Sequence, residues 1–265
     1  MLVSCVMPTW RRFHCVERAI AGFLAQETTL DTELIILNTD VDYPLELDFV
    51  DTRIKIINSN CDQCTGTGYT STGAIRRDAT ALASGDLYMT WDDDDIYWPW
   101  HIEQCWQGLQ RTKKLAWKPK ESFMWVKDAP ELAYNYLEAT VMMYMKEATF
   151  NLNSGPEGLS WFDRLKSQDQ LVEDPDSIPS YCFYWKDPSD QGGHKQSDMN
   201  TWQQADIFEL HKSRCRDFAS KPLTCRSLRY YNTIYDKFIP LWKELEITRT
   251  EHMNKFYEDY ASVVK

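Results

Sequence analysis

Short apolar runs alternate with amphipathic segments along the first part of the chain. The apolar runs, each about the length of a buried strand, are residues 2–7, 33–37, 53–57 and 86–91. Among them, residues 14–26 and 74–84 repeat apolar side chains at the spacing of a helix. Because strands alternate with helices, the pattern predicts a parallel sheet in an α/β domain.

The pattern weakens beyond residue 100. Residues 101–112 and 155–167 predict helices, and residues 139–148 predict a strand that leads into a turn. Residues 116–127 are expected to form a β-hairpin. Beyond residue 200 the sequence predicts mostly helix.

Composition and charge exclude several classes of protein. The chain has 265 residues, of which 43% are hydrophobic, so it can bury a substantial core. Its net charge of −11 argues against a chain that is basic throughout and coats nucleic acid. No apolar run approaches the roughly 20 residues needed to cross a bilayer, and the N-terminal residues do not resemble a signal peptide.

Cysteine usage indicates the cellular compartment. Eight cysteines without secretory features predict reduced thiols, and therefore a cytoplasmic location. Cys61 and Cys64 have the spacing of a zinc or redox pair, but no second pair accompanies them. Two ordinary thiols are therefore the favoured interpretation.

The acidic run Asp92–Asp95 directly follows the fourth apolar run. Ligands of open α/β sheets bind outside the carboxyl ends of the strands. Carboxylates held close together raise each other's pKa unless a cation neutralises them, and hard oxygen ligands suit Mg²⁺ or Mn²⁺. The run therefore predicts a metal–phosphate site. The alternatives are a solvated acidic loop and a calcium site, although no EF-hand spacing follows.

Four segments, in this order and spacing, carry a resemblance to a known family. They read "VSCVMPTW", "AIAGFLAQ", "ELIIL" and "AIRRDATALASGDLYMTWDDDD". Residues 3 to about 100 resemble the nucleotide-sugar half of the family 2 glycosyltransferases, which are inverting enzymes with the GT-A fold. The resemblance implies a Rossmann-like donor-binding half over 1–100, an acceptor-binding and catalytic half over 101–200, and a mainly helical extension over 201–265.

The resemblance also implies roles for individual residues. Pro8, Thr9 and Trp10 would line the nucleotide base, and Arg76 would help to hold it. Asp92 would contact the ribose, and Asp94, in the DXD motif, would ligate the metal on the diphosphate. The expected donor-binding residues are Pro8, Thr9, Trp10, Arg11, Asn38, Asp40, Arg76, Asp92 and Asp93.

This sequence departs from the family pattern at three places in the donor half. Asn38-Thr39-Asp40 stands where the family has paired aspartates, so either Asn38 or Asp40 would read the base edge. Arg11 and Arg77 replace family asparagines, and their charge would face either phosphate or nearby aspartates. Asp93 and Asp95 would cap or orient the chain that follows.

The resemblance is weaker in the acceptor half. "EGLSWFDRL" fits the family pattern at Glu157, Arg164 and Leu165, but Gly158 replaces the second acid. Glu157 is therefore the expected catalytic base. Asp163 and the Glu173–Asp174 pair are the alternatives, and Glu157 would also suit the first turn of a helix without any catalytic role.

Two later segments are further candidates. In residues 181–197, His194 would be a third metal ligand and Lys195 and Ser197 would touch the diphosphate; the alternative is a surface loop. Residues 211–231 are locally basic, which is typical of a solvated helix face and would also suit a polyanionic acceptor.

The sequence thus predicts a metal-dependent inverting glycosyltransferase that transfers a hexose or pentose. The expected donor is a nucleotide-diphosphate sugar, with a UDP-sugar favoured, and the expected cofactor is Mn²⁺ or Mg²⁺. The expected acceptor is a hydroxyl of a glycan or similar molecule, including hydroxymethylated DNA. The alternatives are a nucleotidyltransferase, which usually has a glycine-rich loop after its first strand, and an inactive nucleotide-sugar binder.

Overall fold

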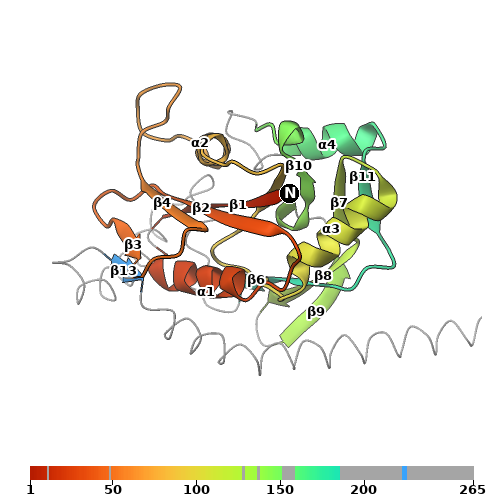
Figure 1. Ribbon diagram of the computed structural model, residues 1–265. Coiled ribbons are helices and arrows are strands. Elements are labelled where there is room, and N and C mark those ends of the chain that lie inside the picture. Colours follow the sequence, from red (N-terminus) through yellow and green to blue (C-terminus); the bar gives the residue numbers. More distant parts are fainter. Residues whose placement is uncertain are drawn as a thin grey trace, which may run out of the picture.

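A seven-stranded sheet forms the centre of the molecule (Figure 1). The structure is a computed structural model, and it describes residues 1–10, 12–47, 49–126, 129–135, 138–150, 159–185 and 223–225. The strand order is β11-β7-β10-β5-β1-β2-β4, and helices cover both faces of the sheet. The predicted α/β class is confirmed.

All strands of this sheet except β10 run in one direction. Parallel ladders join β1 to β2 and β5, β2 to β4, and β7 to β11. β10 is antiparallel to both β5 and β7, so β7 runs the same way as β5. The carboxyl ends of the parallel strands therefore meet at one edge. The strands are β1 (Leu2–Thr9), β2 (Asp31–Asn38), β4 (Ile54–Asn58), β5 (Leu87–Thr90), β7 (Ala116–Pro119), β10 (Met142–Tyr144) and β11 (Leu171–Asp174).

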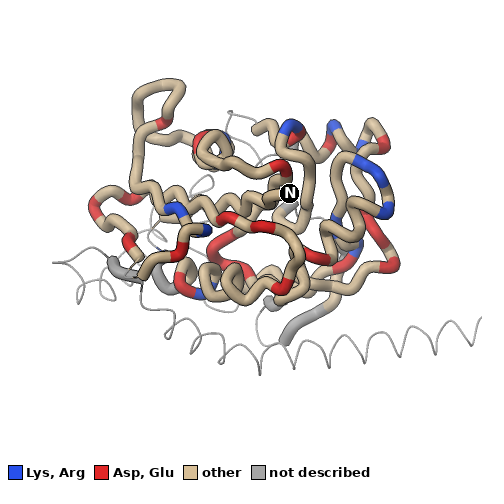
Figure 2. The backbone as a smooth tube through the Cα atoms, in the orientation of Figure 1, with Lys and Arg blue, Asp and Glu red and all other residues tan. Residues whose placement is uncertain are grey.

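Alternate residues of the strands pack against different helices. One cluster joins Cys5 and Leu34 to α1 (Phe13–Leu24) and α3 (His101–Thr112). The other cluster joins Val6 and Ile35 to α2 (Thr72–Ala81) and α4 (Leu159–Ser167). Because both faces are buried, the strands are apolar along their length. In Figure 2 most of the tube is tan, and the charged residues are spread over the molecule in short segments.

Two smaller sheets and two short 3₁₀ helices complete the described fold. One sheet has the order β6-β12-β8-β9, and the other pairs β13 with β3. Their strands are β3 (Leu45–Leu47), β6 (Ile96–Tyr97), β8 (Glu121–Val126), β9 (Ala129–Tyr134), β12 (Tyr181–Trp185) and β13 (Leu223–Cys225). The 3₁₀ helices are η1 (Glu138–Thr140) and η2 (Met145–Glu147).

The hairpin predicted over residues 116–127 is wrong. β7 belongs to the central sheet, whereas β8 pairs antiparallel with β9 in another sheet. The change happens at Lys120, whose backbone N–H donates to Asp174 in the first sheet while its carbonyl accepts from Asn135 N. Two apolar strands separated by one residue look like a hairpin in sequence, because the pattern does not reveal the sheet to which each belongs.

The C-terminal quarter of the chain is described only in part. Residues 223–225 form β13, which runs parallel to β3. The rest of the helical extension predicted for residues 201–265 lies outside the described residues, as does the start of the helix predicted over 155–167. Within the described part, no helix is both long enough and apolar enough to cross a membrane.

Glu33 is a buried carboxylate in β2 that binds side chains or backbone from three other segments of the chain. It accepts hydrogen bonds from Ser4 Oγ at 2.6 Å, Ser84 N at 2.6 Å and Lys55 Nζ at 2.7 Å. Burial alone would raise the pKa of Glu33, but the bonds from Lys55, Ser4 and Ser84 outweigh burial and lower this pKa to about 2.

We predict that Glu33→Gln lowers the free energy of unfolding at pH 7 by about 1–3 kcal/mol. Because the folded pKa is depressed, the carboxylate stabilises the fold above the ordinary pKa of glutamate. That contribution is lost as the pH falls towards 2. Urea unfolding at pH 7 and pH 3 measures the difference, with the exposed Glu46→Gln as the control. An equal loss at both pH values would contradict the prediction.

Candidate functional site

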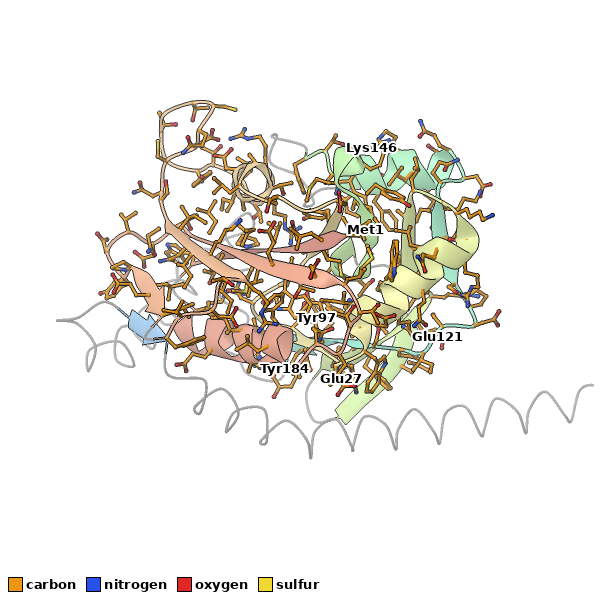
Figure 3. All side chains as sticks on the ribbon, in the orientation of Figure 1. Met1, Glu27, Tyr97, Glu121, Lys146 and Tyr184 are labelled. Atoms are coloured by element: carbon orange, nitrogen blue, oxygen red, sulfur yellow. The ribbon has the colours of Figure 1, made fainter. Side chains whose placement is uncertain are left out.

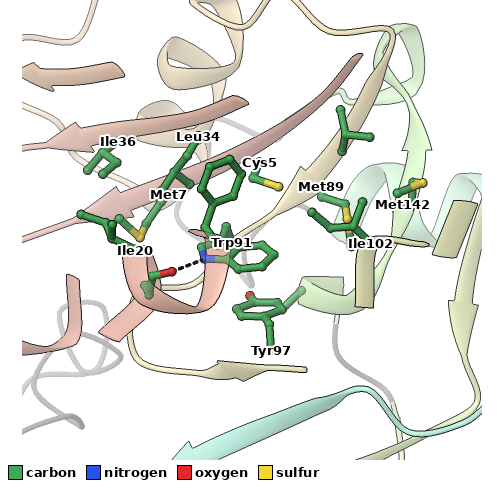
Figure 4. Close-up of a cluster of buried hydrophobic side chains, with 14 of the residues drawn as sticks. Cys5, Met7, Ile20, Leu34, Ile36, Met89, Trp91, Tyr97, Ile102 and Met142 are labelled. Atoms are coloured by element: carbon green, nitrogen blue, oxygen red, sulfur yellow. Dashed lines mark hydrogen bonds between the residues drawn. The ribbon is translucent and has the colours of Figure 1, made fainter. Parts of the chain in front are cut away.

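The acidic run begins where the chain leaves β5, and a buried tryptophan sets its position. The ring of Trp91 stacks on Tyr97 with centroids 3.8 Å apart, and its Nε1 donates to Ala19 O of α1 at 3.0 Å (Figure 4). Asp92 N then donates to Tyr97 Oη at 2.7 Å. The packing of two aromatic rings in the core therefore fixes the backbone at the first aspartate.

The four aspartates have different environments. The side chain of Asp92 is 16% exposed, whereas Asp93, Asp94 and Asp95 are buried. Asp95 accepts hydrogen bonds from Tyr181 Oη and from Tyr184 N of β12. Burial raises the pKa of Asp95, and Asp94 and Asp92 raise it further. Asp95 therefore joins the acidic run to β12.

Arg12 pairs with both middle aspartates. Its Nη2 lies 2.7 Å from Asp93 Oδ1, and its Nη1 lies 2.5 Å from Asp94 Oδ2. Thr9 Oγ1, at the end of β1, donates to Asp93 Oδ2 at 2.6 Å. Arg18 Nη2, from α1, donates to the backbone carbonyl of Asp94 at 2.5 Å. The end of β1 and the start of α1 thus enclose the middle of the acidic run.

These ion pairs stabilise charged side chains in a buried environment. Burial alone would lower the pKa of Arg12, but Asp93 and Asp94 outweigh burial and raise it. Burial raises the pKa of Asp93 and Asp94 raises it further, whereas Arg12 acts in the opposite direction. Arg12 therefore stays protonated and supplies the counter-charge without which two adjacent carboxylates could not be buried.

Arg76 holds the exposed end of the run. It lies in α2, which begins after Ser71, whose side chain accepts from Ala74 N. The Arg76 side chain is 4% exposed, and its Nη2 donates to Asp92 Oδ1 at 2.8 Å. The structure thus brings together the predicted residues Thr9, Arg76, Asp92, Asp93 and Asp94. Pro8 and Trp10, half-buried, adjoin them at the end of β1.

Asn38 and Asp40 lie one strand further along the same edge, since Asn38 pairs with Thr9 in the sheet register. Asn38 Nδ2 donates to the carbonyls of Asp40 and Tyr43 and to Asn58 Oδ1, at distances of 2.9–3.0 Å. Its Oδ1 accepts from Asp40 N. The amide of Asn38 thus holds the β2–β3 loop.

Arg77 pairs with aspartates, one of the two arrangements expected for it. Its Nη2 lies 2.7 Å from Asp62 and 2.6 Å from Asp78. Asp62 also accepts from two backbone N–H groups in the turn that follows it. Arg77 therefore anchors the loop that contains Cys61 and Cys64, and both thiols are free.

Other candidates lie outside the described residues or away from the acidic run. Those outside are Arg11, Glu157, Gly158, His194, Lys195, Ser197 and the basic stretch 211–231 apart from residues 223–225. Of the alternative bases, Asp163 is exposed and Asp174 binds Arg111 and Trp117 Nε1. Glu173 pairs with Lys166 at 3.2 Å, and Arg164 pairs with Glu147.

The carboxylates as arranged do not fit a divalent cation. Their oxygens have the right chemistry for Mn²⁺ or Mg²⁺. However, Asp92, Asp93 and Asp94 are each paired with a guanidinium group. Among the described residues, no three His, Cys, Asp or Glu side chains converge as a metal site.

Sequence reasoning missed Arg12, Arg18 and the tyrosines around the run. Tyr184, for example, lies beside α1, and the guanidinium carbon of Arg18 lies 4.8 Å from its ring centroid (Figure 3). The segment "PTWRR" contained a usable signal. Its arginines follow the first parallel strand and the acidic run follows the neighbouring parallel strand, so both segments lie at the same edge of the sheet.

Comparisons place this architecture among known folds. The sequence matches no model of a protein family and no curated protein. The structure is similar to S. aureus TarS 1–349 in complex with UDP (TM-score 0.52, 12% identity, 82% of this chain and 72% of that chain). The chain has the GT-A fold.

Two further solved structures are similar. One is S. aureus TarS 1–349 in complex with UDP-GlcNAc, with a TM-score of 0.52, 11% identity, and coverage of 90% of this chain and 72% of that chain. The other is a mannosyltransferase from Pyrobaculum calidifontis in complex with GDP-Man and Mn²⁺, with a TM-score of 0.47, 10% identity, and coverage of 94% and 84%. At these identities the likeness concerns the fold alone.

We predict that Tyr97→Phe lowers the free energy of unfolding by about 1–3 kcal/mol. Removing the hydroxyl leaves the N–H of Asp92 without its acceptor next to buried charge. Chemical unfolding followed by tryptophan fluorescence measures the loss. Tyr144→Phe is the control, because it removes a half-buried hydroxyl at the opposite end of the sheet. Equal stability of wild type and Tyr97→Phe would show that the hydroxyl does not fix the run.

Proposed function

We propose that the protein is a glycosyltransferase that binds a nucleotide-diphosphate sugar at the carboxyl edge of β1, β2 and β5. One observation carries the proposal: at this edge of a GT-A fold, Thr9 and Arg12 contact Asp93, and Arg76 contacts Asp92. In open α/β sheets this is the edge at which ligands bind. Two similar structures were determined with UDP and with UDP-GlcNAc, which supports a UDP-sugar as the donor.

Asp92 is the proposed contact for the ribose. Its side chain is 16% exposed, whereas Asp93, Asp94 and Asp95 are buried, and Arg76 holds it in one orientation. A carboxylate fixed in this way can accept hydrogen bonds from sugar hydroxyls. Pro8 and Trp10, half-buried at the end of β1, would pack against the base, and Asp40 would read its edge.

The proposed reaction is transfer with inversion. An acceptor hydroxyl attacks the anomeric carbon, the bond from that carbon to the diphosphate oxygen breaks, and the nucleoside diphosphate leaves with the bonding electrons. The hydroxyl proton passes to a carboxylate base, for which Glu157 is the candidate. Glycans and hydroxymethylated DNA are both proposed acceptors. Dependence on Mn²⁺ or Mg²⁺ stays a prediction, because Asp93 and Asp94 are paired with Arg12.

We predict that Asp92→Asn weakens binding of the donor about ten-fold or more, because a charged acceptor and its ion pair with Arg76 are lost. A thermal-shift screen of nucleotide sugars, with and without Mn²⁺, identifies the donor, and calorimetry then compares the affinities. Asp51→Asn is a matched control, since Asp51 forms an ion pair with Arg53 at the surface.

Product analysis separates the proposed reaction from related ones. Release of a nucleoside diphosphate supports glycosyl transfer. Release of pyrophosphate would indicate a nucleotidyltransferase and contradict the proposal. Donor binding that Asp92→Asn leaves unchanged would place the nucleotide elsewhere.

A further inference from the structure

A cavity of about 370 Å³ lies at the edge of the central sheet opposite the acidic run. It is lined by Tyr144 of β10 and by Leu115, which directly precedes β7. Tyr144 pairs with Leu87, the first residue of β5, whereas the acidic run lies beyond the last residue of β5. A cavity of this size can hold a small molecule. It is therefore a candidate binding site that is separate from the proposed donor site.

Three lysines line this cavity, which is called the lysine pocket below. Lys113 and Lys114 directly follow α3, and Lys146 lies in η2, where Figure 3 labels it. The sheet brings the two segments together, because Tyr144 N donates to Leu115 O at 3.2 Å. Lys113 and Lys146 are exposed, and the side chain of Lys114 is 30% exposed. The fold thus gathers three basic residues around one cavity.

The lysine pocket carries an excess of positive charge on a chain whose net charge is −11. Lys114 Nζ donates to Asp169 Oδ2 at 2.7 Å, so one of the three charges is compensated. No described residue that lines the pocket is acidic. The C-terminal carbonyls of α3 contribute roughly half a negative charge. The charges of Lys113 and Lys146 exceed this contribution, and an anion would neutralise the remainder.

The backbone at the pocket places these lysines at a conformational cost. Lys113 and Asp169 both have a φ of 54°, in the left-handed region that favours glycine. Among the residues that the structure describes, they are the two non-glycine residues with a positive φ. Glycine is the usual residue at such a helix end, but it would bring no charge. Because Asp169 pairs with Lys114, both residues contribute to the lysine pocket, and such outliers favour a functional role.

The rest of the lining indicates the kind of anion. Leu109, Leu115 and Tyr144 add apolar and aromatic surface beside the lysines. A lysine ammonium is a compact charge that suits phosphate, whereas leucine and tyrosine side chains can pack against a carbon ring. We propose that the lysine pocket binds a small organic phosphate, with its phosphate at the two exposed lysines and its ring against Leu115 and Tyr144. This proposal goes beyond the proposed function and does not depend on it.

The test is calorimetry with phenyl phosphate, which carries a phosphate and a ring. The wild-type chain should bind phenyl phosphate more tightly than inorganic phosphate, because the ring adds apolar contact, and benzyl alcohol should not bind measurably. The double variant Lys113→Gln, Lys146→Gln should bind phenyl phosphate about ten-fold more weakly or worse, since two charges that face the phosphate are lost. The matched control Lys120→Gln, Lys166→Gln removes two exposed lysines outside the pocket and should change nothing.

Hydrogen–deuterium exchange then locates the ligand. Saturating phenyl phosphate should slow exchange in the segments that contain residues 109–115 and 143–147. Three results would overturn the proposal: no binding of phenyl phosphate by the wild type, equal binding by the double variant and its control, or protection confined to residues 8–10 and 91–95. Binding to phosphatidylglycerol vesicles that phenyl phosphate does not displace would assign the phosphate to a lipid headgroup, and would also overturn the proposal of a small ligand.

Discussion

The burial of an acidic run at the end of β5 is the constraint on which the site depends. Adjacent carboxylates repel each other and lose hydration on burial, so they need compensation from several directions. Arg12 neutralises the middle of the run, Arg76 holds its start, and Tyr181 and the backbone of β12 hold its end. These partners come from the start of α1, from α2 and from the second sheet, so one charged segment determines how separate elements meet.

The core and the site are coupled through the same few residues. Trp91 packs on Tyr97 inside the core, and Tyr97 accepts the backbone N–H of Asp92 at the site. A change in core packing therefore moves the carboxylate that is proposed to meet the donor. The register of β1 against β2 also shapes the site, because it places Asn38 beside Thr9 and so aligns the loops that follow both strands.

Local patterns in the sequence predicted strands β1, β2, β4 and β5 of the central sheet and placed the acidic run at the end of β5, whereas the roles of the site residues stay predictions. Strands such as residues 33–37 are largely apolar on both faces, and a continuous apolar run of this kind can be recognised in the sequence. The position of Asp92 at the carboxyl edge followed from the apolar run before it, and the role of Arg76 was implied by the resemblance. The specific partner of each charged group was not predicted, because Arg12 and Asp94 are 82 residues apart and only their shared edge of the sheet brings them together. The change of sheet at Lys120 was missed for the same reason, since its bonds reach Asp174 and Asn135.

Hydrogen–deuterium exchange of the chain with and without a bound nucleotide sugar tests the central claim most directly. The donor used is the one that gives the largest thermal shift. Binding at the edge described above should slow exchange in the segments that contain residues 8–10, 38–40, 74–77 and 91–95, because the bound donor would stabilise these segments and exclude solvent from them. Protection confined to α3, β7 or β11, with these four segments unchanged at saturating donor, would contradict the account.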